Sequence, residues 1–339
     1  MIKVPLKTGL FYLYSDMFRT TFHIPPSPFS VNHTAKLVSV GSCFADVIGG
    51  KLEESKFEVV KNPFGIIYNP VSILKSFQLI INNTPLPEDS FIENEGTWYN
   101  YHLHSQVNAS SREELHSSIG EIAKRTKLFL AETQLVIITL GTAFVYRQVA
   151  INEIVANCHK APANKFTKEL LSIYDITESL SQLILLLKTV SPTVNILFTV
   201  SPVRHIKDTI PLNNVSKSLL RIACHTVCEK YSDASYFPGF ELMMDDLRDY
   251  RFYKEDMIHP TNLAENYIWE KFTEAFMDET TRKHIQQWEK LKKALEHKPF
   301  QPESEAYKKF LKETETQLKQ LGQYLNLSKE IKYIQEKLD

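Results

Sequence analysis

Residues 38–47, VSVGSCFADV, join an apolar run directly to a helical pattern. The apolar run is typical of a buried strand, and from Phe44 onward large apolar residues recur four apart. Gly41 permits a tight turn between the two elements, so Ser42 falls at the start of the helix. A serine at that corner is an ordinary N-cap, or it is a nucleophile held at the end of a sheet.

The rest of the chain repeats this strand-then-helix pattern. Apolar runs typical of strands occur at 36–40, 57–60, 135–140 and 194–200, and segments with apolar residues three or four apart lie between them. Alternation of buried strands with helices is typical of a parallel sheet that is covered on both faces. The sequence therefore predicts a three-layer α/β/α domain with a mainly parallel sheet.

The C-terminal part has a different character. After residue 277, two amphipathic segments flank the Pro-containing stretch PFQPES, which predicts a helical hairpin. The second segment carries a heptad-like apolar seam, so oligomerisation through these helices is the alternative to packing within the chain. We expect an unstructured extension over 1–16, the α/β domain over 17–277 and a helical tail over 278–339.

Composition excludes several function classes. The net charge of −1 gives no basic field for nucleic acid, and no apolar run approaches the ~18 residues that a membrane span needs. The four cysteines are too sparse for a disulfide framework, and the first residues lack a small-residue cleavage site. We therefore expect a cytoplasmic protein whose partner is a small molecule, with neither nucleic acid nor membrane.

A second informative stretch is FYKEDMIHPT, at residues 252–261. Asp256 and His259 stand three apart in it, just before another helical pattern. A histidine that serves as a base needs a carboxylate to fix its tautomer and to stabilise its cation, and one loop can bring both groups together. Taken alone, the stretch is better interpreted as a capped helix start with a surface histidine.

The order of these stretches resembles a known family. VGSCFADVIGGKL, NPFGIIYNP, LGTAFVYR, IVANCHKAP, FTVSPVRHIKD and YFPGFELMMDDLRDYRFYKEDMIHPT resemble the successive blocks of the GSCFA-domain proteins, from about residue 17 to about residue 275. That family resembles a branch of the SGNH (GDSL-like) esterases and acyltransferases. The resemblance implies a flavodoxin-like sheet and a serine nucleophile that needs no cofactor. The candidate metal ligands His102, His104, Cys158 and His159 show no second-pair spacing, so we expect no metal site.

The resemblance assigns roles to individual residues. Ser42 matches the serine of the first block, Gly65 the glycine of the second, and Asp256 with His259 the pair of the last block. We expect Ser42 to attack an acyl ester, with His259 as the base and Asp256 orienting it, and superfamily analogy suggests an ester borne by a carbohydrate. The Ser42 hydroxyl should then lie within hydrogen-bond reach of the His259 ring, or slightly beyond. Water as the acceptor makes an esterase and a sugar hydroxyl makes a transferase, and the sequence does not separate these.

One departure from the superfamily pattern bears on catalysis. Its third block carries an asparagine that helps to hold the oxyanion, and here the matching position is Ala143, which has no donor. Asn157 is the first candidate replacement and His159 the second, with Thr142 and the backbone N–H groups of Ser42 and Gly65 as further ones. Arg204 is expected to line the substrate pocket. Because the asparagine is missing, a non-catalytic small-molecule or glycan-binding protein on the same scaffold is the alternative function.

Overall fold

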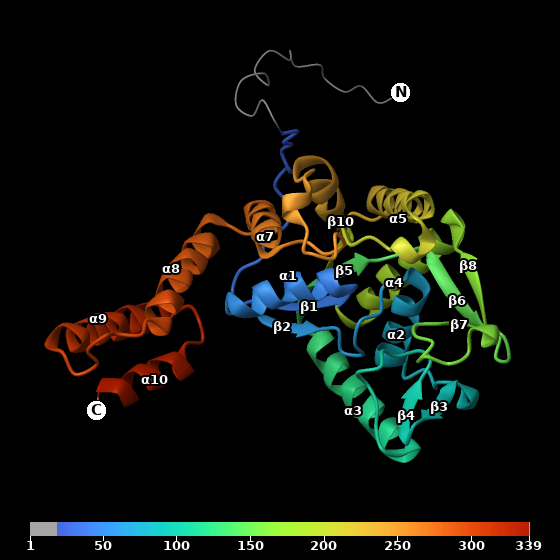
Figure 1. Cartoon of the computed structure of the whole chain (residues 1–339), viewed down its shortest axis with the longest axis horizontal. Helices are drawn as coiled ribbons and strands as arrows, with labels where there is room; N and C mark the ends of the chain where they lie inside the picture. The colour runs from blue at the N-terminus through green and yellow to red at the C-terminus, as the bar shows by residue number, and fades with distance from the viewer. Residues whose placement is uncertain (1–18, 339) are drawn as a thin grey trace, which may run out of the picture.

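The computed structural model describes residues 19–338, so the extension expected over 1–16 lies outside the described residues. Its centre is a five-stranded sheet in which all strands are parallel, in the order β10-β9-β5-β1-β2 (Figure 1). This is the flavodoxin-like order. The strands are β1 (Lys36–Gly41), β2 (Glu58–Lys61), β5 (Thr133–Leu140), β9 (Asn195–Val200) and β10 (Ala234–Tyr236).

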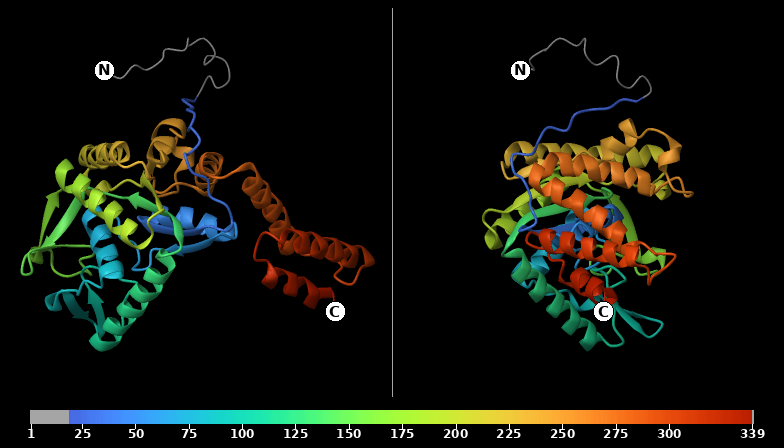
Figure 2. Two further views of the ribbon diagram at one scale, coloured as in Figure 1. Left: turned by 180° about the vertical axis from the view of Figure 1, so that it is seen from behind. Right: turned by 90° about the vertical axis from the view of Figure 1, so that its left-hand side faces the viewer.

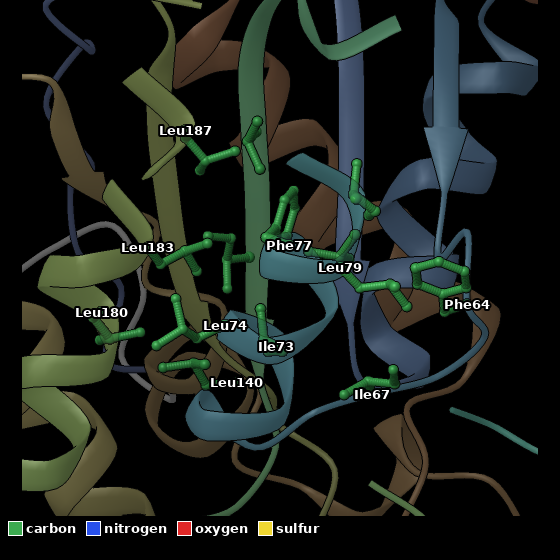
Figure 3. Packing of buried hydrophobic residues seen from close by; sticks show 14 of the residues in the cluster. Phe64, Ile67, Ile73, Leu74, Phe77, Leu79, Leu140, Leu180, Leu183 and Leu187 are labelled. Atoms are coloured by element: carbon green, nitrogen blue, oxygen red, sulfur yellow. The ribbon is translucent and has the colours of Figure 1, made fainter. Parts of the chain in front are cut away.

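Alternate residues of the sheet face two separate hydrophobic clusters, so both faces are covered by helices as predicted. Val38, Val136 and Ile196 face one cluster, whereas the residues that follow or precede them face the other. The helices of the first cluster are α2 (Pro70–Asn82), α3 (Arg112–Leu130), α4 (Ile173–Val190) and α5 (Ile210–Lys230), and those of the second are α1 (Cys43–Glu54) and α7 (Asn262–Phe276). Figure 3 shows side chains of α2 and α4 packed against the strands in the first cluster.

Two small antiparallel sheets are inserted into this frame, and the sequence did not predict them. One is the hairpin β3 (Phe91–Asn94) and β4 (Thr97–Asn100). The other lies at the right of Figure 1 and contains β6 (Phe144–Gln148), β7 (Glu153–Val155) and β8 (Phe166–Leu170). Because β6 begins soon after β5 ends, the second sheet stands at the carboxyl end of the central strands. The short helix α6 (Gly239–Glu241) follows β10.

The C-terminal tail is helical, but it has three helices where the sequence predicted two. They are α8 (Glu279–Glu296), α9 (Glu305–Leu321) and α10 (Ser328–Leu338), and they extend away from the sheet in Figures 1 and 2. The apolar seam of α9 packs on α8 and α10 within the chain. The tail is tied to α1 by the Trp288 indole N–H, which donates to the Glu54 carbonyl at 2.6 Å. The domain boundary at residue 277 stays a prediction.

The helices of residues 19–338 include none that combines the length and apolar character required to cross a membrane.

Candidate active site

The turn between β1 and α1 requires a glycine. Gly41 has φ +135°, and a Cβ built on it would lie 2.1 Å from the Thr139 carbonyl oxygen of the neighbouring strand. Its N–H donates to Asn62 Oδ1 at 2.8 Å, which ties the turn to the segment after β2. Strand β1 therefore ends against β5, and the next residue begins α1 at the carboxyl edge of the sheet.

Ser42 is the N-cap of α1 and is almost fully buried, with 4% of its surface exposed. Its Oγ accepts the Phe44 N–H at 3.3 Å, and its own N–H donates to the Thr139 carbonyl at 3.0 Å. The capping bond uses only a lone pair of the hydroxyl, so the hydroxyl proton remains available to a base. Both roles considered for this serine, cap and nucleophile, are compatible with this geometry.

Asp256 and His259 are paired within one loop. His259 Nδ1 lies 2.7 Å from Asp256 Oδ2, and Asp256 Oδ1 accepts the N–H groups of Ile258 and His259 at 2.9 Å each. These bonds from the His259 backbone and ring, together with the Ile258 N–H, lower the pKa of Asp256 to about 2. Because an ionised carboxylate only accepts, Nδ1 carries a proton and Nε2 of a neutral ring has a free lone pair.

One cavity of about 470 Å³ brings the two motifs together. Ser42, Thr142, Arg204 and His259 all line it, at the carboxyl ends of β1, β5 and β9. Within residues 19–338 no hydrogen bond joins Ser42 to His259, and the histidine side chain is 42% exposed. A larger groove of about 590 Å³ runs along α7 and α8, but no histidine or cysteine lines it. We therefore identify the Ser42 cavity as the candidate site by the residues that line it rather than by its volume.

Arg204 and Thr142 are held firmly at the cavity wall. Arg204 donates to the Tyr253 hydroxyl at 2.8 Å and to the Met257 carbonyl at 3.3 Å, and its guanidinium lies over the Tyr253 ring. It thereby contacts the loop that carries Asp256 and His259. Thr142 Oγ1 lies 2.9 Å from Ser216 Oγ and accepts the Phe144 N–H, so its hydroxyl is engaged in the turn.

Asn157 and His159 do not project into this cavity, contrary to the prediction. His159 is buried elsewhere: Nε2 lies 2.8 Å from the Asn100 carbonyl oxygen, Nδ1 lies 3.1 Å from Ser105 Oγ, and the ring stacks on Tyr99. The Asn157 amide accepts the His159 N–H at 2.8 Å and donates to Ser105. Their hydrogen-bonding groups fix the turn before β8, so neither side chain fills the space beside Ala143.

Gly65 is also displaced from its predicted role. It does not line the Ser42 cavity, and its N–H donates to the Asn62 carbonyl at 2.7 Å in a turn. The glycine is needed for packing, because φ is +76° and an added Cβ would lie 2.4 Å from His104 Cβ. The Ser42 N–H is likewise committed to Thr139. Neither predicted backbone donor is free to hold an oxyanion in this structure.

Two neighbouring residues of α5, Ser216 and Lys217, were not among the predicted site residues. Ser216 Oγ accepts the Ala143 N–H at 2.7 Å, and Lys217 Nζ donates to the carbonyls of Gly141 and Ser201 at 2.6 and 2.7 Å. Lys217 is 2% exposed, and burial lowers its pKa to about 7. The sequence could have indicated that Lys217 is buried, because it lies one turn before Leu220 on the apolar face of α5.

Residues 19–338 contain no group of three or more histidine, cysteine or acidic side chains placed to hold a metal ion. The Cys43 thiol lines the cavity beside Ser42, and burial followed by the nearby Asp46 carboxylate raises its pKa. A raised pKa disfavours the thiolate, which is the nucleophilic form of cysteine.

Comparisons with known proteins identify the family. The GSCFA family profile matches residues 36–272, and that of the GSCFA domain protein C-terminal domain matches residues 288–339. The chain therefore belongs to the GSCFA family. No curated protein matches the sequence.

One solved structure similar to the chain is a carbohydrate esterase family 2 enzyme plus carbohydrate-binding domain from Corynascus thermopiles (Myceliophthora fergusii). The match has 11% identity and a TM-score of 0.36, and it covers 74% of this chain and 67% of that chain.

Proposed function

We propose that this GSCFA-family protein is a serine-dependent ester hydrolase or acyltransferase. The observation that carries the proposal is the shared cavity of Ser42 and His259, in which the histidine is oriented by Asp256 at 2.7 Å. A hydroxyl, a base and a carboxylate in this relation are the parts of a nucleophilic serine site. The position at the carboxyl edge of a parallel sheet is where open α/β folds bind their ligands.

The proposed reaction has two halves. Ser42 Oγ attacks the acyl carbonyl carbon while His259 Nε2 takes the hydroxyl proton, and the Asp256 carboxylate stabilises the imidazolium. The tetrahedral intermediate collapses by breaking the bond to the alcohol oxygen, which receives the proton from His259, and the acyl group stays on Ser42. Water or a sugar hydroxyl then attacks the acyl-serine, again with His259 taking the proton. Release of the acid or the new ester restores Ser42.

The Ser42 hydroxyl and the His259 ring are not hydrogen-bonded to each other in the described residues, so the two groups have to approach for this reaction. Catalytic hydrogen bonds are often long in ligand-free sites and tighten when substrate binds. His259 lies on a loop, and its neighbour Met257 has φ +58° and is half exposed. A small shift of this loop toward Ser42 is therefore part of the proposal.

The oxyanion needs donors other than those first expected. Cys43 and Thr142 line the cavity, and the backbone N–H of neither is bonded within residues 19–338. The Cys43 N–H belongs to the first turn of α1, where the helix offers unpaired donors and a positive dipole end. We propose these two N–H groups as the oxyanion donors in place of the asparagine that Ala143 replaces.

The cavity volume bears on the substrate. At about 470 Å³ it is in the range of small-molecule sites and much larger than an acetyl group alone. Ile66, Val145 and Val155 give it an apolar wall. This space suits an acyl group together with part of the alcohol, and a carbohydrate ester is our proposed substrate class.

A non-catalytic binding protein is the second candidate. The committed N–H groups of Ser42 and Gly65, together with Ala143, leave the site without the three donors that the superfamily pattern implies. A protein that binds the same ester without cleaving it needs none of them.

Formation of an acyl-serine distinguishes the two candidates. Incubation with a chromogenic acyl ester, such as 4-nitrophenyl butyrate, should release nitrophenol and add the mass of one acyl group to the wild-type chain. Ser42→Ala should do neither. Ser111→Ala is the matched control, because Ser111 also caps a helix by accepting a backbone N–H. Binding of an ester without turnover in the wild type would favour the binding protein instead.

A further inference from the structure

The Ser42 cavity collects positive charge in a chain whose net charge is −1. Lys168, Arg204 and Lys207 line it, and Asp208 is the one carboxylate among the described lining residues. Asp208 is already paired with Lys168. Two cations at the cavity are thus left over after this pairing.

Neither Arg204 nor Lys207 has a carboxylate partner among residues 19–338. The acceptors of Arg204 are a tyrosine hydroxyl and a backbone carbonyl, which leave its charge uncompensated and part of its N–H fork unused. Lys207 is exposed at the rim. An anion placed between them would gain charge-assisted hydrogen bonds, which are stronger than neutral ones.

Lys217 lies next to the lining residue Ser201 and adds positive charge only while its amine is protonated, because burial lowers its pKa to about 7. Lys217 is buried against two carbonyls and has no carboxylate within ion-pair distance in the described chain. The pKa of His205 in the cavity wall is lowered to about 4, first by burial and then by the positive charges of Lys217 and Lys168, and Asp208 opposes this shift. The start of α1 adds its positive dipole end. Asp46 is exposed on α1 outside the cavity and is bonded to Asn62.

The position of Arg204 indicates which half of the ester, the alcohol or the acyl group, an anion-binding site would contact. Arg204 contacts the loop that bears His259, and His259 is the group that would protonate the departing alcohol. The apolar wall, which includes Val145 and Val155, belongs to the antiparallel sheet of β6, β7 and β8. Arg204 thus lies on the His259 side of the cavity, where the alcohol would depart, whereas Val145 and Val155 offer the acyl group an apolar surface.

We infer that the substrate is an ester whose alcohol part carries a carboxylate, as an acylated sugar acid does, and that Arg204 and Lys207 bind this carboxylate. The inference rests on the proposed ester chemistry at Ser42. It adds that the carboxylate belongs to the alcohol rather than to the acyl group.

Three matched esters test the inference: acetylated methyl glucoside, acetylated methyl glucuronoside, and the hemisuccinate of methyl glucoside. Released acid is measured as kcat/KM at low and at moderate salt. We expect the glucuronoside ester to exceed the neutral ester by about tenfold, in the range of a charge-assisted hydrogen bond, with the preference shrinking as salt rises. Equal rates, or a preference for the hemisuccinate, would overturn it.

Reversing the charge of Lys207 at the cavity rim tests its role in binding the carboxylate. In Lys207→Glu the ratio of the glucuronoside rate to the glucoside rate should fall to about one or below, because repulsion replaces attraction. Lys124→Glu makes the same change of charge at an exposed site on α3 and should keep the wild-type ratio. A ratio that survives Lys207→Glu would contradict the assignment.

A binding measurement separates failure of the inference from failure of the proposed reaction. If none of the esters is cleaved, the ester chemistry fails, and calorimetry with methyl glucuronoside and methyl glucoside on the full chain still tests the anion site. Binding of the glucuronoside alone, lost in Lys207→Glu, would support the anion site in a protein without turnover. Equal binding of both sugars, or of neither, would overturn it.

Discussion

His259 Nδ1 lies 2.7 Å from Asp256 Oδ2, and the other oxygen of the same carboxylate accepts the His259 backbone N–H at 2.9 Å. One carboxylate thus fixes both the main chain and the ring of the same residue. This leaves His259 Nε2 as the ring nitrogen that can receive a proton. The pairing is local to four residues of sequence, which is why the spacing alone could suggest it.

Replacing the carboxylate should therefore damage turnover more than binding. In Asp256→Asn the ring loses its anionic acceptor, so we expect kcat to fall ~10²–10⁴-fold with KM little changed. Steady-state kinetics on a chromogenic ester measure this. Asp245→Asn, at an exposed position in the preceding segment, is the control and should retain the wild-type kcat. Wild-type kcat in Asp256→Asn would remove Asp256 from the mechanism.

Ser216 should stabilise the turn that carries Ala143. Ser216→Ala leaves the Ala143 N–H buried without its acceptor at 2.7 Å, so the free energy of unfolding should fall by about 1–3 kcal/mol. Urea unfolding followed by fluorescence measures the change. Ser117→Ala, on the exposed face of α3, should alter it by much less. Equal effects of the two substitutions would show that the bond to Ala143 contributes nothing measurable.

Lys217 should make stability depend on pH. Its pKa is about 7 when folded, below the ~10.4 of an unfolded lysine, so between these values the unfolded chain binds a proton that the folded chain does not. The burial penalty is therefore complete below about pH 7 and relieved as pH rises toward 10.

The difference in unfolding free energy between wild type and Lys217→Met isolates this effect. It should move in favour of the wild type as pH rises from 7 to 9, by up to about 1.4 kcal/mol per pH unit, and stay flat below 7. Urea unfolding at several pH values measures it, with Lys124→Met as the exposed-lysine control. A flat difference across this window would mean that the Lys217 amine is not desolvated.

The last two helices of the tail should be dispensable for the chemistry. No residue of 298–338 lines the Ser42 cavity, so a chain that ends at His297 should cleave ester at a rate within about twofold of the wild type. Its melting temperature should fall, because removal of α9 and α10 exposes the apolar face of α8 around Trp288 and Leu291. Loss of hydrolysis in a truncated chain that still melts cooperatively would show that the tail supports the site.

Sequence pattern was sufficient for four of the five strands of the central sheet and for the helices that cover it. Those strands are short apolar runs and the helices have regular apolar spacing, so local periodicity carries the information. The edge strand β10 was missed because its three residues, Ala234–Tyr236, form no apolar run. Gly41 also indicated a turn from the sequence, because glycine readily adopts a positive φ. In the structure, its contact with the Thr139 carbonyl oxygen leaves no room for a side chain. The third tail helix was missed because it is short and has one fully buried residue, Ile334.

The details of the site depended on contacts between distant segments. Asn157 and His159 follow the third block closely in sequence, yet their partners hold them away from Ser42. These partners are Asn100, the last residue of β4, and Ser105, in the segment that follows it. Lys217 was overlooked for the same reason. Its acceptors are strand-end carbonyls of β5 and β9, and a lysine in a helical pattern ordinarily indicates a solvated face.

Covalent labelling with a fluorophosphonate probe tests the serine most directly. The probe reacts with a serine that a neighbouring base activates, so the wild-type chain should gain one probe mass, located by peptide mapping at Ser42. Cys43→Ala should be labelled like the wild type, because the thiol is protonated and has no part in the proposal. Ser42→Ala should not be labelled. Labelling that persists in a folded Ser42→Ala, or a folded wild type that never reacts, would contradict the assignment of Ser42 as the nucleophile.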